Sequence, residues 1–435
     1  YFYLNGSMHR VIQSIFMLIL VTGFLLVLLY PDDIIYEENI NSFKENNISI
    51  TNTTSYKPKE DAYLQNIKKL IKNSDLSTFD TLIRDSNKVL LKDFDEQLES
   101  IRKANLDNFA FIRFDKFKEE YGQLRGLYLN GYLFNNDEKR NLISEILTKT
   151  NVNTLVVDVK TDNGHILFDA DIEEIELLKN ERIKFSAEDL TELRSVKDIY
   201  LIARIVVYQD PLFAKIFPEE AVYDSRLDKP YSQNGQYFLD PSSIKVQNYI
   251  KNIALQACEL GFDEIQYDYI RYPDSNSKFM IFDHENTTEN RVKNINSFLK
   301  DSKDILHAEK CLLSADTFGF ILTNNKDGGI GQNLESIVNS VDFISPMVYP
   351  SHYSKGSFGY QNPNDYPYEV ITAALNDALE RGVESRQLRP FLQGFWHSTE
   401  DIQKNIAAAS DLEMDWLIWN ILSVYELETF TKLSG

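Results

Sequence analysis

The chain has 435 residues, of which 43% are hydrophobic and 12% aromatic, a composition that excludes a disordered protein and allows a sizeable core. The 45 basic and 66 acidic residues give a formal net charge of −21, so the long-range field repels phosphate backbones and we expect no nucleic acid partner. If the substrate is a saccharide, this field favours a neutral or cationic glycan.

Residues 1–30 predict an N-terminal leader followed by a transmembrane signal anchor. Residues 11–30 are mainly apolar and long enough to cross a bilayer as one helix. Arg10 precedes this run and acidic residues follow it, which predicts a cytoplasmic N-terminus and export of the rest of the chain. A cleaved signal peptide is the alternative, although no A-x-A cleavage pattern follows the apolar run. The anchor predicts a single-pass membrane protein with an extracytoplasmic domain.

Two segments connect this anchor to the main domain. Residues 31–60 are rich in Asn, Ser, Thr and Glu, which predicts a solvated polar linker. Residues 61–120 carry apolar side chains at helical spacing, for example Leu64, Ile67, Leu70 and Ile71, which predicts a helical stalk.

From residue 121 to residue 435, short apolar strands alternate with amphipathic helices. This alternation predicts an α/β fold with a parallel sheet and crossover helices, and eight such strands predict a (β/α)8 TIM barrel. A doubly wound open sheet is the alternative. The predicted strands are 125–132, 154–161, 200–207, 264–270, 312–318, 343–349, 388–395 and 416–422.

The two cysteines, Cys258 and Cys311, have no C-x-x-C spacing. Cys258 falls on the apolar face of a predicted helix. We expect two buried free thiols, with a disulfide as the alternative.

Three aspartates occupy inward positions near the C-terminal ends of predicted strands, where the catalytic groups of TIM barrels lie. In the fourth strand, Gln266 and Asp268 share one face, while Ile265 and Tyr267 share the other. Asp158 and Asp316 have similar apolar flanks in the second and fifth strands. Two carboxylates in different environments can divide the acid and nucleophile roles, so Asp268 and Asp316 are the predicted catalytic pair.

Other polar and aromatic residues near the strand ends are predicted to bind substrate, because aromatic rings stack on the apolar faces of sugars. Lys160 is expected to form an ion pair rather than a Schiff base, because its acidic neighbours would raise its pKa. The six histidines show no H-x-H or H-E-x-x-H spacing, so we expect no metal and no cofactor. The predicted substrate-binding residues are Asp158, Lys160, Arg204, Gln266, Arg271, Tyr349, His352, Gln393, Trp396, Trp419 and Asn420.

The chain resembles the bacterial putative glycosyl hydrolase domain family, domain of unknown function 4015, from about residue 126 to residue 425. The motifs that carry this resemblance are residues 156–160, 202–207, 261–273, 314–319, 344–353 and 417–420, in the family's order. The resemblance implies a TIM barrel that acts on carbohydrate. Some relatives carry an acidic residue where this chain has Gly394, which places more weight on Asp268 and Asp316.

These observations predict a glycoside hydrolase that cleaves an envelope or extracellular polysaccharide by a two-carboxylate mechanism. Asp316 would be the general acid, and Asp268 the nucleophile or base. The first alternative is a noncatalytic glycan-binding barrel that takes part in envelope assembly. The second is a lyase or aldolase that uses Lys160.

Overall fold

The computed structural model describes residues 100, 103, 106–178, 182, 184–274 and 278–431. The predicted anchor and linker lie outside these residues, as does most of the predicted stalk. No helix among the described residues is long and apolar enough to cross a membrane.

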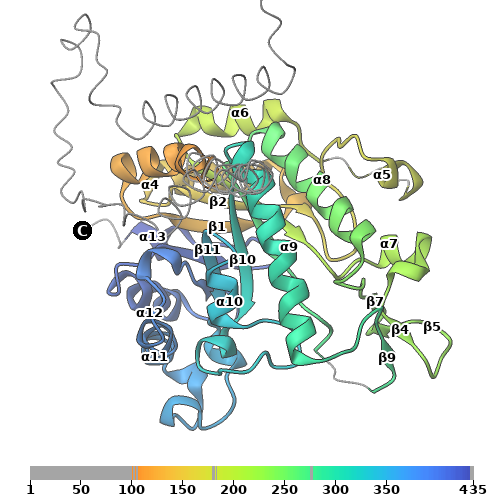
Figure 1. Cartoon of the computed structure of the whole chain (residues 1–435). Coiled ribbons are helices and arrows are strands. Elements are labelled where there is room, and N and C mark those ends of the chain that lie inside the picture. The colour runs from red at the N-terminus through yellow and green to blue at the C-terminus, as the bar shows by residue number, and fades with distance from the viewer. Residues whose placement is uncertain are drawn as a thin grey trace, which may run out of the picture. The chain divides into compact units, whose positions relative to one another are not determined.

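Eight parallel strands close into a barrel with the neighbour order β1-β13-β12-β11-β10-β8-β3-β2 (Figure 1). The first and last strands pair with each other, with Leu127 opposite Ile418, so the doubly wound open sheet is wrong and the predicted (β/α)8 barrel is confirmed. All eight predicted strands are present. Their bounds are β1 Arg125–Leu129, β2 Thr154–Lys160, β3 Tyr200–Val206, β8 Glu264–Asp268, β10 Leu312–Phe318, β11 Phe343–Met347, β12 Phe391–Gln393 and β13 Trp416–Trp419.

Most strands end earlier than predicted, because the chain turns away from the barrel as soon as it reaches the C-terminal rim. Strand β8 stops at Asp268, and the next residue, Tyr269, has a φ of +49°, in the left-handed region that no strand adopts. Trp396, in the loop after β12, has a φ of +56°. These turns move residues that were predicted as strand ends into the rim loops.

Helices surround the barrel, as Figure 1 shows for α8 and α9, which pack against each other, and α9 also packs against β10. Ser243 caps the first turn of α8 by accepting a hydrogen bond from the Val246 amide, and Gly261 ends the helix with a φ of +118°. The helix bounds are α4 Asp137–Lys149, α5 Glu173–Leu178, α6 Ala187–Val196, α7 Pro211–Ile216, α8 Ile244–Leu260, α9 Thr288–Ala308, α10 Leu334–Val338, α11 Pro367–Glu380, α12 Thr399–Ser410 and α13 Leu427–Thr431.

Strand β8 shows how the core divides into two layers. Ile265 and Tyr267 point outward into the layer between strands and helices, where the Tyr267 ring stacks on Phe298 of α9 at 5.4 Å between centroids. Gln266 points inward, and its side-chain amide donates to Ser345 Oγ of β11. The predicted assignment of polar residues to the inward face is therefore confirmed.

A helical segment, residues 106–121, packs against residues of the barrel interior. Phe114 and Phe117 are buried among Tyr200, Phe343 and other interior side chains. Polar contacts also join the same segment to the end of the barrel where the strands begin. Arg113 pairs with Asp198, Lys118 with Asp415, and Asp107 with His307. The segment plugs the end of the barrel from which the strands start, so the C-terminal end is the open one.

Short strands lie in the loops that follow β3 and β8. Strand β4 (Tyr223–Asp224) pairs with β5 (Lys229–Pro230) and with β9 (Met280–Ile281), so the two loops form one small sheet beside the barrel (Figure 1). A second pair, β6 (Ser232–Gln233) and β7 (Gln236–Tyr237), lies in the first of these loops.

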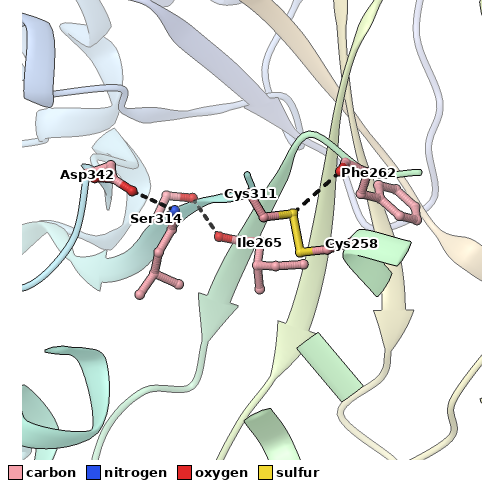
Figure 2. The surroundings of a disulfide bond; sticks show 7 residues. Cys258, Phe262, Ile265, Cys311, Ser314 and Asp342 are labelled. Atoms are coloured by element: carbon pink, nitrogen blue, oxygen red, sulfur yellow. Dashed lines mark hydrogen bonds between the residues drawn. A yellow bond between two sulfur atoms is a disulfide. The ribbon is translucent and has the colours of Figure 1, made fainter. Parts of the chain in front are cut away.

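Cys258 and Cys311 form a disulfide, so the predicted pair of free thiols is wrong. Cys258 lies near the end of α8 and Cys311 lies immediately before β10, as Figure 2 shows. Both positions belong to the end of the barrel where strands begin, because helix α9 returns the chain to that end. Their Cα atoms are 6.1 Å apart, within the normal range for a disulfide.

Candidate active site

A cavity of about 460 Å³ lies at the C-terminal ends of the strands, where TIM barrels hold their active sites. Its wall is mainly aromatic, with two aspartates and two arginines as the charged groups. The lining residues are Arg204, Asp268, Tyr269, Arg271, Asp316, Phe318, Gly319, Phe320, Met347, Tyr349, His352, Tyr353, Phe391 and Trp419.

Arg204 of β3 links the carboxyl groups of the two strands that flank its own, β2 and β8. Its Nε donates to Asp268 Oδ2 at 3.0 Å, and its Nη1 donates to Asp158 Oδ1 at 2.6 Å. Tyr128 donates its hydroxyl to the other oxygen of Asp158. The second oxygen of Asp268, Oδ1, accepts from the Tyr269 amide at 2.6 Å. Asp268 is therefore held at both oxygens, and Asp158 and Tyr128 fix the arginine that holds it.

Strand register explains why these groups meet. Asp158 of β2 is the register partner of Arg204 in β3, and Arg204 is in turn the partner of Gln266 in β8. Asp268 is the next inward-facing residue of β8 after Gln266, so it lies closer to the C-terminal end of the barrel and reaches the cavity there. Trp419 of β13 covers the guanidinium, whose carbon is 4.7 Å from the indole centroid.

Asp316 comes from β10, on the other side of β8 from Arg204. Its Oδ2 is 3.9 Å from Arg204 Nε, and its Oδ1 has no hydrogen-bond partner among the described residues. Burial raises the pKa of Asp316 well above its usual range, and the negative charge of Asp268 raises it further. Arg204 opposes this rise without cancelling it. The two carboxyl groups at this mouth therefore differ in environment: Asp268 is bound by a cation, whereas Asp316 retains its proton more strongly.

The other titratable groups near the pair respond to burial and to the same charges. Burial alone would lower the pKa of Arg204, but Asp268 and Asp158 outweigh it and hold that pKa well above its usual range. Burial raises the pKa of Asp158 in spite of Arg204. Burial and the charges of Asp316 and Asp268 raise the pKa of Tyr349, so its hydroxyl remains protonated. Burial lowers the pKa of His352 and favours a neutral imidazole.

The structure brings seven of the predicted site residues to the wall of this one cavity. They are Asp268, Asp316, Arg204, Arg271, Tyr349, His352 and Trp419.

Four other predicted residues lie within the barrel wall, where each makes at least one polar contact with a protein group, although Gln266 Oε1 has no hydrogen-bond partner among the described residues. Asp158 is behind Arg204, and Gln266 is bound to Ser345. Lys160 is fully buried, with Nζ 2.9 Å from Asp210 Oδ2 and donating to the Val206 carbonyl at 2.7 Å. An amine enclosed in this way is inaccessible to a carbonyl substrate, which disfavours Schiff-base chemistry. Gln393 accepts from the backbone and the hydroxyl of Ser351.

The last two predicted residues lie in loops outside the cavity wall. Asn420 donates to the carbonyls of Gly394 and Val424, so it organises the loop after β13. Trp396 is 82% exposed and contacts Phe395, with 5.1 Å between ring centroids.

Several lining residues were not predicted from the sequence. Tyr269, Phe318, Phe320, Met347 and Phe391 line the cavity, and Tyr128 supports it from behind. Tyr128 was detectable, because it lies on the first strand and a tyrosine hydroxyl on an inward face needs a partner. The others follow strand ends or stand among apolar neighbours, where no periodic signal separates a cavity wall from a core.

Two glycines allow close packing beside the cavity. A Cβ on Gly394 would lie 2.5 Å from Ile418 Cγ2 and 2.9 Å from the Trp419 carbonyl oxygen, so an acidic side chain does not fit here without rearrangement. A Cβ on Gly319 would lie 2.6 Å from the Met347 carbonyl oxygen. The carboxylates of this mouth therefore come from β8 and β10.

Within the part of the chain that the structure describes, no group of three or more His, Cys, Asp or Glu side chains is arranged to hold a metal ion. The cation that lies between the aspartates is the Arg204 guanidinium.

Comparison with known proteins identifies the domain. The family model described as "Putative glycosyl hydrolase domain" (DUF4015) matches residues 126–425, more than two thirds of the chain. No curated protein matches the chain.

The chain is similar to several solved structures. A hypothetical protein from Ruminiclostridium thermocellum is 30% identical, with 44% of this chain and 96% of that chain covered and a TM-score of 0.39. The PgaB (BpsB) glycoside hydrolase domain from Bordetella bronchiseptica is 11% identical, with 72% and 99% covered and a TM-score of 0.55. An α-galactosidase from Thermus thermophilus is 12% identical, with 72% and 61% covered and a TM-score of 0.44.

Proposed function

The chain belongs to the putative glycosyl hydrolase domain family, and from this premise we propose that it is an O-glycosidase that cleaves an envelope or extracellular polysaccharide. The observation that carries the proposal is the pair Asp268 and Asp316. Neighbouring strands bring these two carboxyl groups to one cavity, where the Arg204 guanidinium binds Asp268 and burial raises the pKa of Asp316. Glycosidases pair a protonated carboxylic acid with a second carboxyl group that acts as nucleophile or base.

In the proposed reaction, Asp316 donates its proton to the glycosidic oxygen as the bond from that oxygen to the anomeric carbon breaks. Asp268 attacks the anomeric carbon and forms a glycosyl ester. Water then hydrolyses this ester, with Asp316 taking one proton from the water, so the enzyme returns to its starting state. Arg204 and the Tyr269 amide hold the Asp268 carboxyl group in one orientation before attack.

The geometry around Arg204 supports retention of anomeric configuration. Asp268 Oδ2 and Asp316 Oδ2 lie 3.0 and 3.9 Å from the same Nε, so these two oxygens are separated by at most the sum of the distances, about 6.9 Å. Retaining enzymes place their carboxyl groups about 5 to 5.5 Å apart, whereas inverting enzymes need about 6.5 to 9.5 Å. Most of the inverting range is therefore out of reach, and we assign Asp268 as the nucleophile.

The cavity wall supports a sugar as the ligand. Tyr349 and Trp419 lie beside the carboxylates, and Phe318 and Phe320 come from the loop end of β10. Aromatic faces of this kind stack on the C–H faces of pyranose rings, while polar groups such as His352 bind hydroxyls.

We further propose that the barrel works outside the cytoplasm, held to the membrane by a helix at residues 11–30. The apolar run with Arg10 before it supports this orientation. The Cys258–Cys311 disulfide adds independent support, because disulfides persist in oxidising compartments and are rare in the cytosol.

The test is turnover of a broad glycan panel by the full chain, compared with Asp268→Asn and Asp316→Asn. We expect cleavage of at least one glycan class by the parent protein and its loss in both variants, each of which must retain the parent's circular dichroism spectrum. Unchanged cleavage in folded variants would contradict the assignment. Measurable glycan affinity without turnover across the panel would instead favour a noncatalytic binding barrel.

A further inference from the structure

Arg271 is a buried cation in the cavity wall that has no carboxylate partner among the described residues. It is 7% exposed and follows β8 by three positions. The comparable buried arginines are all paired: Arg204 with Asp268 and Asp158, Arg291 with Asp327, and Arg389 with Glu264. A buried charge without a counter-charge lowers the stability of the fold. The presence of such a charge in the wall of a ligand cavity therefore indicates that the ligand carries the opposite charge.

Aromatic rings hold the Arg271 side chain in place without neutralising it. Its guanidinium carbon is 4.9 Å from the ring centroid of Phe318, 5.0 Å from that of Tyr269 and 5.5 Å from that of Phe238. These contacts restrict the arginine to one region of the wall, which lowers the entropy lost when a ligand binds.

The free hydrogen-bonding edge of Arg271 has the geometry of an oxyanion receptor. Nη1 donates to the Tyr272 carbonyl at 3.1 Å. Nε and Nη2 make no hydrogen bond within the described part of the chain. Two parallel N–H groups on a planar guanidinium bind a carboxylate, sulfate or phosphate group through two hydrogen bonds.

Arg271 is not needed to balance the catalytic pair. The strongest influences on the pKa of Asp316 are burial and then the charges of Asp268, Arg204, Arg389 and Glu264. Arg204 contacts Asp268 directly, so the catalytic carboxylates have their own cation. The charge of Arg271 therefore remains available to a ligand in the same cavity.

We propose that Arg271 is a specificity residue that selects an acidic glycan, one whose sugar bears an oxyanion close to the bond that is cleaved. This inference rests on the proposed glycosidase function. It differs from the neutral or cationic glycan that the net charge of −21 favours. At physiological ionic strength, charges are screened beyond about 8 Å, so a cation in direct contact outweighs the distant surface field.

Binding to the full chain tests the proposal with matched oligosaccharide pairs that differ only in charge. One arm compares oligosaccharides of galacturonic, glucuronic and mannuronic acid with their carboxyl-reduced forms. A second arm compares sulfated galactan oligosaccharides with their desulfated forms, which distinguishes a carboxylate from a sulfate as the recognised group. We expect one acidic member to bind between about tenfold and a hundredfold more tightly than its neutral partner, as charge-assisted bonding predicts.

Three variants assign that preference to the residue. Arg271→Gln should abolish the preference for the acidic oligosaccharide. Arg271→Lys should retain part of this preference, because lysine keeps the positive charge but lacks the two parallel N–H groups of the guanidinium. Arg226→Gln is the matched control, since Arg226 also lies on an aromatic ring, 4.7 Å from the Phe279 centroid, yet is paired with Asp224 and is outside the cavity wall. This control should leave the preference unchanged. Melting temperatures of all three variants exclude misfolding as the cause.

The possible outcomes separate this inference from the function on which it rests. Equal affinity within every pair, or a preference that survives in folded Arg271→Gln, overturns the acidic-glycan assignment. If neutral glycans are cleaved without any acidic preference, the inference fails and the glycosidase function stands. If acidic glycans bind through Arg271 and no glycan is cleaved, the recognition site stands and the glycosidase function fails. If Arg271→Gln does not fold, the ratio in Arg271→Lys decides.

Discussion

Arg204 binds one oxygen of Asp268 through both Nε and Nη2, so the carboxylate and the guanidinium are locked in one relative orientation at the barrel mouth. The other oxygen of Asp268 accepts a hydrogen bond from the Tyr269 amide. These hydrogen bonds hold Asp268 in a fixed position, while Asp316 lies close by without a hydrogen bond to its Oδ1 among the described residues. The asymmetry between the two carboxyl groups leads to most of the predictions below.

Replacement of the proposed acid should have an effect that depends on the leaving group. We expect Asp316→Asn to lower kcat on a natural glycan by about 10²- to 10⁴-fold, because general acid catalysis contributes about that much. An aryl glycoside with a good leaving group needs little protonation, so formation of its glycosyl ester should be much less affected. With a nitrophenyl glycoside as substrate, the pre-steady-state release of nitrophenolate measures the rate of this step. Equal losses on both substrates would contradict the acid role.

The proposed nucleophile predicts the stereochemistry of the product. Because the Asp268 and Asp316 oxygens are at most about 6.9 Å apart, we expect retention of the anomeric configuration. Proton NMR of the first-formed hemiacetal, recorded before mutarotation, measures this directly. An initial product of inverted configuration would show that Asp268 acts as a base on water.

The raised pKa of Asp316 predicts the pH dependence of activity. The reactive form is the protonated acid, so kcat/KM falls as the pH rises through the pKa of Asp316 in the free enzyme. Burial and the charge of Asp268 place that pKa well above the usual carboxyl range, so the fall should lie at correspondingly higher pH. A pH–rate profile measures it. A decline near pH 4 would contradict the environment described for Asp316.

The same shift predicts a change in stability with a definite sign. The folded state binds the Asp316 proton more tightly than the unfolded state does, so this residue lowers the free energy of unfolding as the pH rises above the unfolded pKa. Asp316→Asn removes that loss. We therefore expect the variant to gain melting temperature relative to the parent as the pH is raised from 4 to 8, measured by thermal denaturation. A constant difference across this range would contradict the shift.

Tyr128 should act as a positioning residue. Tyr128→Phe removes the hydroxyl that Asp158 accepts, and the carboxylate that orients Arg204 is left with fewer donors. We expect a loss of about 1 to 3 kcal/mol in the free energy of unfolding and a fall in kcat of about tenfold, with KM nearly unchanged. The matched control is Tyr249→Phe, because the buried Tyr249 hydroxyl has no hydrogen-bond partner among the described residues. Equal effects of the two substitutions would rule out a positioning role.

The disulfide should stabilise the barrel without affecting catalysis. Cys258 and Cys311 are 53 residues apart in sequence, and a crosslink of this span typically contributes about 2 to 4 kcal/mol. Both residues lie at the end of the barrel opposite the cavity. The double substitution Cys258→Ser with Cys311→Ser should therefore lower the guanidinium midpoint and leave kcat unchanged. Denaturation curves measure the midpoint, and a midpoint equal to that of the oxidised parent would contradict this contribution.

The sequence by itself determined the eight strands with their intervening helices, from which the barrel was predicted, and the inward direction of Asp268 and Asp316. The elements and the side-chain directions follow from local periodicity, because alternation along a strand assigns each side chain to one face whatever its distant neighbours are. Helix ends such as Gly261 are local for the same reason.

Only the tertiary structure decided which of these side chains meet. The contacts of Arg204 with Asp158 and Asp268 depend on the register of three strands. The cavity wall depends on loops that turn back over the C-terminal ends of the strands. Closure also encloses Lys160 with Asp210. It likewise brings Cys258 to Cys311 across 53 residues. Such contacts join residues far apart in the chain, so their distances are set by how the barrel closes and cannot be derived from the spacing along one strand.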